Sequence, residues 1–249
     1  MELKYVVACD FGQTYDYSTV AVTERVLEEV SKPYEHTTRA VAGSRRREVR
    51  QDLEGHYRLV RLDRVPLRTP YTTIAKGIVK LVRELYRKQL EEAPAVPAIP
   101  YPRDGGRQIT VGLSIDEGGV GKAVRDILLQ EMIDNIPKNE PKVKFYPITV
   151  HGGANTSRDN GFWHVPKRDL ISAGLVCYQN KTLKVGALRW RDVLEQELVN
   201  YRLKVNISTS NVAFESLRSG QHDDLLFAVC LACWTWERAL PKQKYTTTL

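Results

Sequence analysis

The chain has 249 residues, of which 42% are hydrophobic and 27% are charged, a composition that excludes a disordered or fibrous protein. With 37 Lys and Arg against 30 Asp and Glu, the net charge is +7, which favours a polyanionic partner such as a nucleic acid. No apolar run approaches the roughly 20 residues of a membrane span. The first residues also lack the apolar region of a signal peptide. We therefore expect an intracellular protein that is neither secreted nor bound to a membrane.

Short apolar or β-branched runs that end at turn residues predict six strands. They lie at 3–9, 18–23, 56–67, 109–115, 143–150 and 182–185. Apolar residues at helical spacing predict five helices. They cover 71–92, 122–133, 166–178, 191–203 and 222–238. This order indicates one α/β domain over 1–240, a central mixed sheet flanked by helices.

Four stretches are polar or rich in proline and are predicted to lie outside regular elements. Residues 31–56 and 93–107 are expected to be loop excursions, 151–164 a loop, and 241–249 a polar tail. Proline cannot continue a helix, which excludes one across 93–107. Cys230 and Cys233 form a C-x-x-C inside an apolar helix without further Cys or His nearby, so we expect them to pack in the core and not to bind a metal.

Four aspartates stand where predicted elements end or begin. Asp10 and Asp116 each close an apolar strand, while Asp223 and Asp224 open the last helix. In an α/β sheet, neighbouring strands bring such residues to one edge, where ligands bind. Converging carboxylates repel one another unless a cation neutralises them, and hard ions such as Mg²⁺ or Mn²⁺ prefer oxygen ligands. Two such ions can hydrolyse a phosphodiester, although each aspartate alone also fits a turn or a helix cap.

Several segments together resemble the nuclease domain of the large terminase subunit of viruses, bacteriophages in particular. They follow the family order between residues 3 and 240 and include ACDFGQTYDYSTVAV, VGLSIDEGGVGKAVRDIL and GQHDDLLFAVCLACW. The resemblance implies an RNase H-like (RuvC-like) fold and metal-dependent endonuclease activity on double-stranded DNA during genome packaging in the host cytoplasm. It also implies two Mg²⁺ or Mn²⁺ ions on Asp10, Asp116, Asp223 and Asp224. His222 and Asp16 are expected beside these catalytic ligands.

The chain departs from full-length terminases because it has no P-loop. In the nearest string, DEGGVGKA, Asp116 replaces the first glycine and Ala123 replaces the Ser or Thr. An ATPase motor domain and the portal and small-terminase proteins are therefore expected only as partners. Three alternatives stay open: a junction resolvase or transposase-like nuclease of the same fold, a DNA-binding relative without catalysis, and a sugar-kinase or actin-like ATPase suggested by DFGQT.

Basic side chains define the expected path of DNA, because neutralising phosphates dominates nonspecific affinity. The residues chosen for this role are Arg45, Arg46, Arg47, Arg58, Arg61, Lys122, Lys167 and Arg168, and Arg64 and Arg68 also fit it. The sequence contains no helix-turn-helix or zinc-finger pattern, so little sequence preference is expected.

Overall fold

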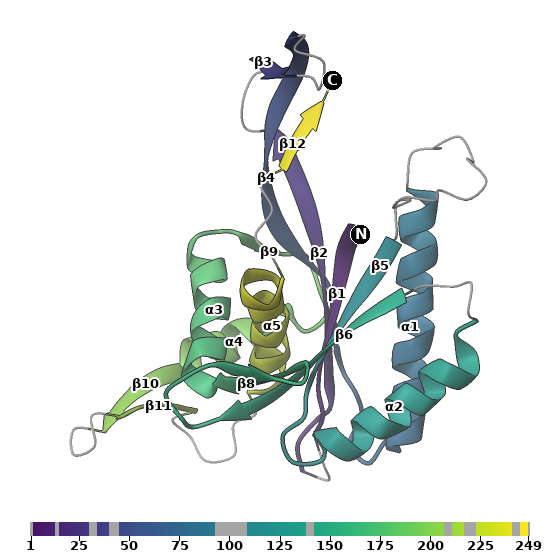
Figure 1. Ribbon diagram of the computed structural model, residues 1–249. Coiled ribbons are helices and arrows are strands. Elements are labelled where there is room, and N and C mark those ends of the chain that lie inside the picture. Colours follow the sequence, from purple (N-terminus) through teal and green to yellow (C-terminus); the bar gives the residue numbers. More distant parts are fainter. Residues whose placement is uncertain are drawn as a thin grey trace.

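The protein is described by a computed structural model that covers residues 2–12, 15–29, 34–39, 45–92, 109–137, 142–206, 211–216, 223–240 and 245–248. Within these residues, ten strands form one mixed sheet (Figure 1). The strands are β1 (Glu2–Asp10), β2 (Thr19–Glu29), β3 (Tyr34–Arg39), β4 (Arg45–Arg64), β5 (Ile109–Asp116), β6 (Lys142–His151), β7 (Ser157–Asp159), β8 (Phe162–Pro166), β9 (Leu183–Val185) and β12 (Tyr245–Thr248). The spatial order is β12-β4-β2-β1-β5-β6-β8-β7, and β3 and β9 also pair with β4.

The centre of the sheet is β1, which runs antiparallel to β2 and parallel to β5. Its side chains alternate between two cores, as the pleat of a strand requires. Val6 and Ala8 enter one core, and Tyr5, Val7 and Cys9 enter the other. Because both faces are covered, β1 reads as a continuous apolar run, and this is why the sequence predicts it well.

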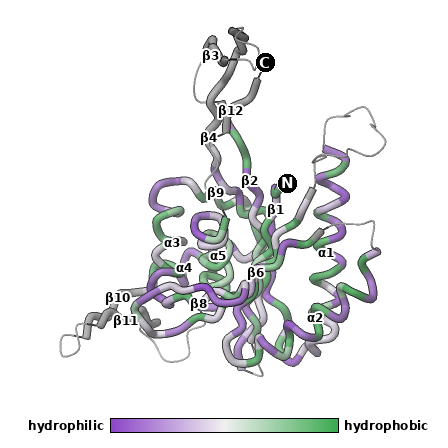
Figure 2. Tube along the Cα trace, in the orientation of Figure 1, coloured by the Kyte–Doolittle hydropathy of each residue, from purple (hydrophilic) through white to green (hydrophobic). Residues whose placement is uncertain are grey.

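Helices cover both faces of the sheet. One face carries α1 (Tyr71–Glu91) and α2 (Gly121–Asn135), and the other carries α3 (Lys167–Gln179), α4 (Arg191–Asn200) and α5 (Asp224–Trp234) (Figure 1). Apolar residues concentrate in the central strands and in α5, which is buried along its whole length and continues as a π-helix, Thr235–Ala239 (Figure 2). In the described part of the chain, no helix combines the length and the apolar character needed to cross a membrane.

The predicted loop at 31–56 is wrong, and so is the predicted polar tail. β2 and β4 pair as a long antiparallel arm, β3 pairs with the start of β4, and β12 pairs with residues 50–53 (Figure 1). The first half of β4 reads RRREVRQDLE, which has almost no apolar alternation. Its regularity comes from backbone pairing, so a hydrophobic pattern could not reveal it.

Two further predictions need correction. The predicted loop 151–164 contains the hairpin β7–β8, whose turn is Asn160-Gly161 with φ of 47° and 91°, a typical hairpin signal that the sequence analysis missed. The predicted helix 191–203 ends at Asn200, where the chain enters a separate two-stranded ribbon, β10 (Tyr201–Asn206) and β11 (Asn211–Ser216). The predicted connector 93–107 lies outside the described residues.

Candidate metal centre

Asp10 and Asp116 are brought together by the pairing of two parallel strands. Cys9 pairs with Ile115, and the two aspartates are the next residues at the carboxyl ends of β1 and β5. Parallel neighbours end at the same edge of a sheet, which is the usual place for a ligand site in this class of fold. The predicted juxtaposition of these two strand ends is therefore present.

The start of α5 is held against the same edge. Thr19 is the pairing partner of Asp10 on β2, and its hydroxyl donates a hydrogen bond to the backbone oxygen of Asp224 over 2.9 Å. On the other side, the Leu226 N–H donates to Glu197 Oε2 over 2.8 Å. These two contacts fix the first turn of α5, and with it Asp223 and Asp224, beside Asp10.

Electrostatics shows that the four carboxylates interact. Burial raises the pKa of Asp10 well above its usual range, and the neighbouring charges of Asp116, Asp224 and Asp223 raise it further, in that order. Burial also raises the pKa of Asp116, while hydrogen bonds from the backbone N–H groups of Gly118 and Val150 oppose that rise. The group is therefore a concentration of negative charge that a cation would relieve.

Asp223 and Asp224 occupy different surroundings, as two adjacent residues at a helix start should. Asp224 is the first helical residue and is only 7% exposed. Asp223 precedes the helix, its side chain is 30% exposed, and its Oδ2 lies 3.6 Å from the Lys167 Nζ.

Lys167 lies at the acid group, because β8 ends at the same sheet edge and α3 begins immediately after it. Val150 of β6 pairs with Val165 of β8, two residues before Lys167. The Lys167 ammonium lowers the pKa of Asp10 and of Asp116, against the effect of burial. It is the one basic residue of the predicted DNA path for which the described structure shows this coupling to the acids.

Arg64, expected on the DNA path, instead forms a buried pair behind α5 with Glu197, a residue that the sequence did not mark. Arg64 Nη2 donates to Glu197 Oε1 over 2.6 Å, and their side chains are 11% and 6% exposed. Burial raises the pKa of Glu197 to about 7, and the charges of Asp224 and Asp223 add to the rise. Glu197 is one of several acids on a polar helix, so no local pattern could have marked it.

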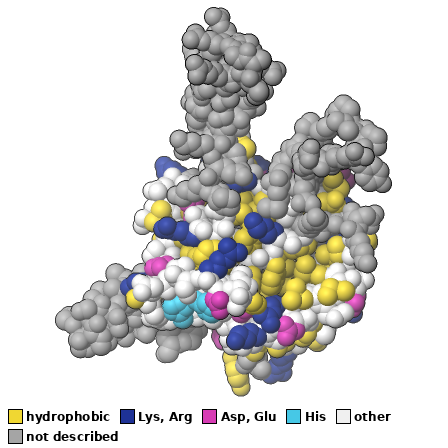
Figure 3. Space-filling view, viewed as in Figure 1, with side chains coloured by type: hydrophobic (Ala, Val, Ile, Leu, Met, Phe, Trp, Pro, Cys, Tyr) yellow, Lys and Arg dark blue, Asp and Glu magenta, His cyan; other side chains and the backbone are white. Residues whose placement is uncertain are grey.

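The other predicted residues are placed as follows. Asp16 is exposed in the loop after β1, and Lys122 is exposed at the start of α2. Arg58 pairs with Glu24, Arg61 with Asp63, and Arg168 with Asp169 and the backbone oxygen of Ala154. On the face seen in Figure 3, Lys and Arg side chains form several small groups and no continuous band. His222 and the side chains of Arg45, Arg46 and Arg47 lie outside the described part.

The carboxylates suit a hard divalent ion, because Mg²⁺ and Mn²⁺ prefer oxygen ligands. A few carboxylates are enough where the phosphate of a substrate supplies the remaining ligands. Among the described residues, no three His, Cys, Asp or Glu side chains stand in positions that would already hold an ion. The four aspartates therefore match a divalent ion in the type of their donor atoms and in their charge, and they lie at one edge of the sheet.

Comparison with known proteins places this arrangement in a fold class. The mixed sheet with helices on both faces is the RNase H-like α/β fold. Among solved structures, the human cytomegalovirus terminase nuclease domain soaked with Mn matches 95% of this chain and 86% of its own, with a TM-score of 0.50 and 8% identity. A second structure of that domain matches the same shares, with a TM-score of 0.50 and 9% identity. No protein-family model and no curated protein matches the sequence.

The chain therefore has the fold of a terminase nuclease domain, which confirms the fold class predicted from the sequence.

Proposed function

We propose that the chain is a divalent-metal-dependent endonuclease that cleaves double-stranded DNA. The observation that supports this best is the meeting of Asp10, Asp116 and the first turn of α5 at one sheet edge. The matching fold belongs to a terminase nuclease domain that was studied with Mn. By that analogy, the DNA is a viral genome being packaged, and an ATPase motor domain with portal and small-terminase proteins would be the partners.

In this proposal, Asp10, Asp116, Asp223 and Asp224 hold two Mg²⁺ or Mn²⁺ ions. When bound, such ions supply an activated water and stabilise the leaving oxygen of a phosphodiester. Hydrolysis adds water at phosphorus and breaks one P–O bond, leaving a phosphate on one strand end and a hydroxyl on the other.

The chain itself supplies rigidity and charge. Asp10 sits on the central strand, where every residue from Tyr5 to Cys9 is buried, so its backbone has little freedom to move. The Thr19 and Glu197 contacts hold the start of α5 in register with it. Lys167 places a positive charge beside Asp223, where it can also attract a DNA phosphate.

The test is cleavage of supercoiled plasmid DNA in Mg²⁺ or Mn²⁺, with EDTA as the control. We expect nicked and linear products with either ion and none in EDTA. Ca²⁺ should not support cleavage, because it tolerates looser coordination with more ligands. Cleavage that persists in excess EDTA, or an absence of cleavage with every divalent ion, would contradict the proposal.

A further inference from the structure

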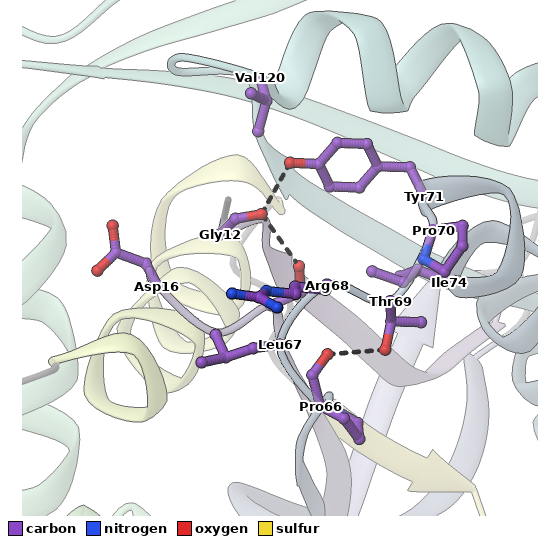
Figure 4. Close-up of a pocket in the computed structure, with 11 residues that line it drawn as sticks. Gly12, Asp16, Pro66, Leu67, Arg68, Thr69, Pro70, Tyr71, Ile74 and Val120 are labelled. Atoms are coloured by element: carbon purple, nitrogen blue, oxygen red, sulfur yellow. Dashed lines mark hydrogen bonds between the residues drawn. The ribbon is translucent and has the colours of Figure 1, made fainter. Parts of the chain in front are cut away.

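Two hollows lie on opposite faces of the sheet. The smaller, of about 380 Å³, lies beside α1, where the Tyr71 hydroxyl donates to the backbone oxygen of Gly12 over 2.8 Å and ties two of its walls together (Figure 4). The larger, of about 710 Å³, lies beside α3 and the end of α5. None of the four aspartates of the candidate metal centre lines either hollow. The larger one is therefore a separate feature, and we call it the α3 groove.

One side of α3 forms the long wall of the α3 groove. Asp169, Ala173, Val176, Cys177 and Asn180 all line it. These residues follow one another at intervals of one to four positions that return to the same side of a helix. Val176 is apolar and yet 50% exposed. Apolar surface in the middle of this wall is therefore open to a ligand.

Two tryptophans supply the aromatic part of the lining. Trp163 of β8 and Trp234 at the end of α5 contact each other edge to face, with their ring centroids 5.3 Å apart. Trp234 is buried and Trp163 is half-buried, so Trp163 is the ring that a ligand can reach. The two rings form one joined surface, and tryptophan is among the residues that most often dominate binding at protein interfaces.

The carboxylates of the groove are already engaged within the protein. Asp169 Oδ2 accepts a hydrogen bond from the Thr156 hydroxyl over 3.2 Å. Glu237 Oε1 accepts one from the Tyr57 hydroxyl over 2.8 Å. These two acids therefore do not call for a cationic ligand.

The charge left unmatched at the groove is positive. Arg238 lines the groove and is exposed. The exposed Arg158 of β7 places its guanidinium 4.9 Å from the centre of the Trp163 ring. Neither arginine forms an ion pair with a carboxylate of the described residues. An acidic ligand would supply the missing partners through charge-assisted hydrogen bonds.

The extent of the groove fits a segment of polypeptide. Its wall runs along α3 from Asp169 to Asn180, which is about three helical turns or about 16 Å. An extended chain of about five residues has that length. The lining residues Thr156, Ser172 and Asn180 are polar or exposed around the apolar centre. An apolar centre with a polar rim is the usual anatomy of a protein interface.

We propose that the α3 groove binds a segment of a partner protein that carries an aromatic or aliphatic residue close to acidic residues. The apolar side chain packs on Trp163 and Val176, and the carboxylates pair with Arg238 and Arg158. This assignment is independent of the proposed nuclease function, because no residue of the candidate metal centre takes part in it.

The test selects binders from a random peptide library displayed on phage, with the whole native protein as the target. An enriched peptide is then synthesised, and its affinity for the native protein and for single variants is measured by isothermal titration calorimetry. We expect the enriched peptides to share an aromatic or aliphatic residue with Asp or Glu nearby.

The variants locate the bound peptide. Val176→Asp places a charge in the apolar wall and should weaken binding at least about tenfold. Its matched control is Val199→Asp, since Val199 is a 71% exposed valine on α4 outside the groove, and this change should leave the affinity unchanged. Arg238→Glu should weaken binding at least about threefold and should slow association most at low salt. Thermal unfolding shows whether each variant is folded, and the exposure of all three positions favours a native fold.

A selection that enriches no peptide would overturn the docking site, and so would peptides that bind Val176→Asp as tightly as the native protein. Peptides that lose affinity equally in Val199→Asp would also overturn it, because they would not depend on the groove. Enriched peptides without acidic residues, or native affinity in Arg238→Glu, would overturn the pairing of charges. Each result is obtained without DNA or metal, so it stands apart from any result on cleavage.

Discussion

Asp10 destabilises the folded chain at neutral pH. Burial and three neighbouring carboxylates raise its pKa, so the folded state holds a proton that the unfolded state releases. Stability from this group is present below the unfolded pKa of about 3.9 and is lost as pH rises through the higher folded value. Without metal, Asp10→Asn should therefore unfold at a higher urea concentration than the native protein at pH 7. The gain should vanish near pH 3, and equal stability at pH 7 would contradict the assignment.

The same substitution should abolish most cleavage. Metal ions supply several kcal/mol of transition-state stabilisation, and about 1.4 kcal/mol is tenfold in rate. We expect Asp10→Asn to cut plasmid DNA at least about 100-fold more slowly in Mn²⁺. A variant that is more stable and yet inactive would separate the loss of a ligand from a loss of fold. Near-native cleavage would remove Asp10 from the site.

Asp224 and Asp223 should differ in their importance. Asp224 raises the pKa of Asp10 more than Asp223 does, and Asp223 already forms an ion pair with Lys167. We expect Asp224→Asn to lose at least about 100-fold in cleavage and Asp223→Asn roughly tenfold, on the scale of tenfold per 1.4 kcal/mol. The experiment measures the maximal cleavage rate of each variant and the Mn²⁺ concentration at which the rate is half of that maximum. If both variants cleave DNA as fast as the native protein and at the same Mn²⁺ concentration, the two aspartates only cap α5 and do not bind metal.

Single residues could be predicted where a local pattern marked them. Asp10 and Asp116 follow apolar strands, and Asp224 opens an apolar helix, so each stood out in the sequence. Lys167 was predicted only as a DNA contact, because its place beside Asp223 depends on the pairing of β6 with β8. The Glu197 contact depends on how α4 meets α5, and no sequence pattern carries that information.

At the scale of elements, the Arg64–Glu197 pair joins β4, α4 and α5. Glu197→Ala would leave Arg64 buried without its counter-charge and the Leu226 N–H without its acceptor. Breaking a buried pair from one side costs about 3–5 kcal/mol, whereas replacing both partners with apolar residues is often close to neutral. We expect urea unfolding to show this loss for Glu197→Ala and a smaller loss for Arg64→Met with Glu197→Leu. Equal losses would contradict the pair as the cause.

The contact between α3 and α5 depends on a glycine. A methyl group at Gly174 would collide with the Cys230 sulfur, whereas one at Gly77 on α1 would meet nothing within 4 Å. Both glycines are helical, so Gly77→Ala should stabilise by up to about 1 kcal/mol through helix propensity. Gly174→Ala should destabilise by about 1–3 kcal/mol through overpacking. Urea denaturation of the two variants compares them directly, and a stabilising Gly174→Ala would show that the helices can separate without cost.

Elements with a clear hydrophobic period were predictable, and those held by backbone pairing were not. β1, β5 and α1 alternate or repeat apolar residues in the expected way, and their bounds agree with the prediction to within a few residues. β3, the first half of β4 and β12 carry polar residues at most positions and become strands only through their pairing.

At the scale of the whole molecule, the net charge of +7 has a measurable consequence for DNA binding. Counterion release makes affinity fall with salt, by about 10³ to 10⁵ between 50 and 200 mM for 6–10 phosphate contacts. We expect such a decrease with Asp10→Asn protein, which binds without cutting, and the same affinity for two unrelated duplexes. A flat salt profile would contradict electrostatic binding, and a large difference between duplexes would contradict the lack of sequence preference.

The four cysteines can report how fast different parts of the native chain open. All are buried free thiols. Cys9 lies in the core between the sheet and α1, and Cys177 of α3 and Cys230 and Cys233 of α5 lie in the core on the other face of the sheet. Burial raises the pKa of Cys9 and Cys230, so little reactive thiolate forms while the fold is closed. A thiol reagent can therefore react only after local opening. Mass analysis of labelled fragments would give the labelling rate of Cys9 and of the other three cysteines separately. These rates compare local opening on the two faces of the sheet without any engineered probe.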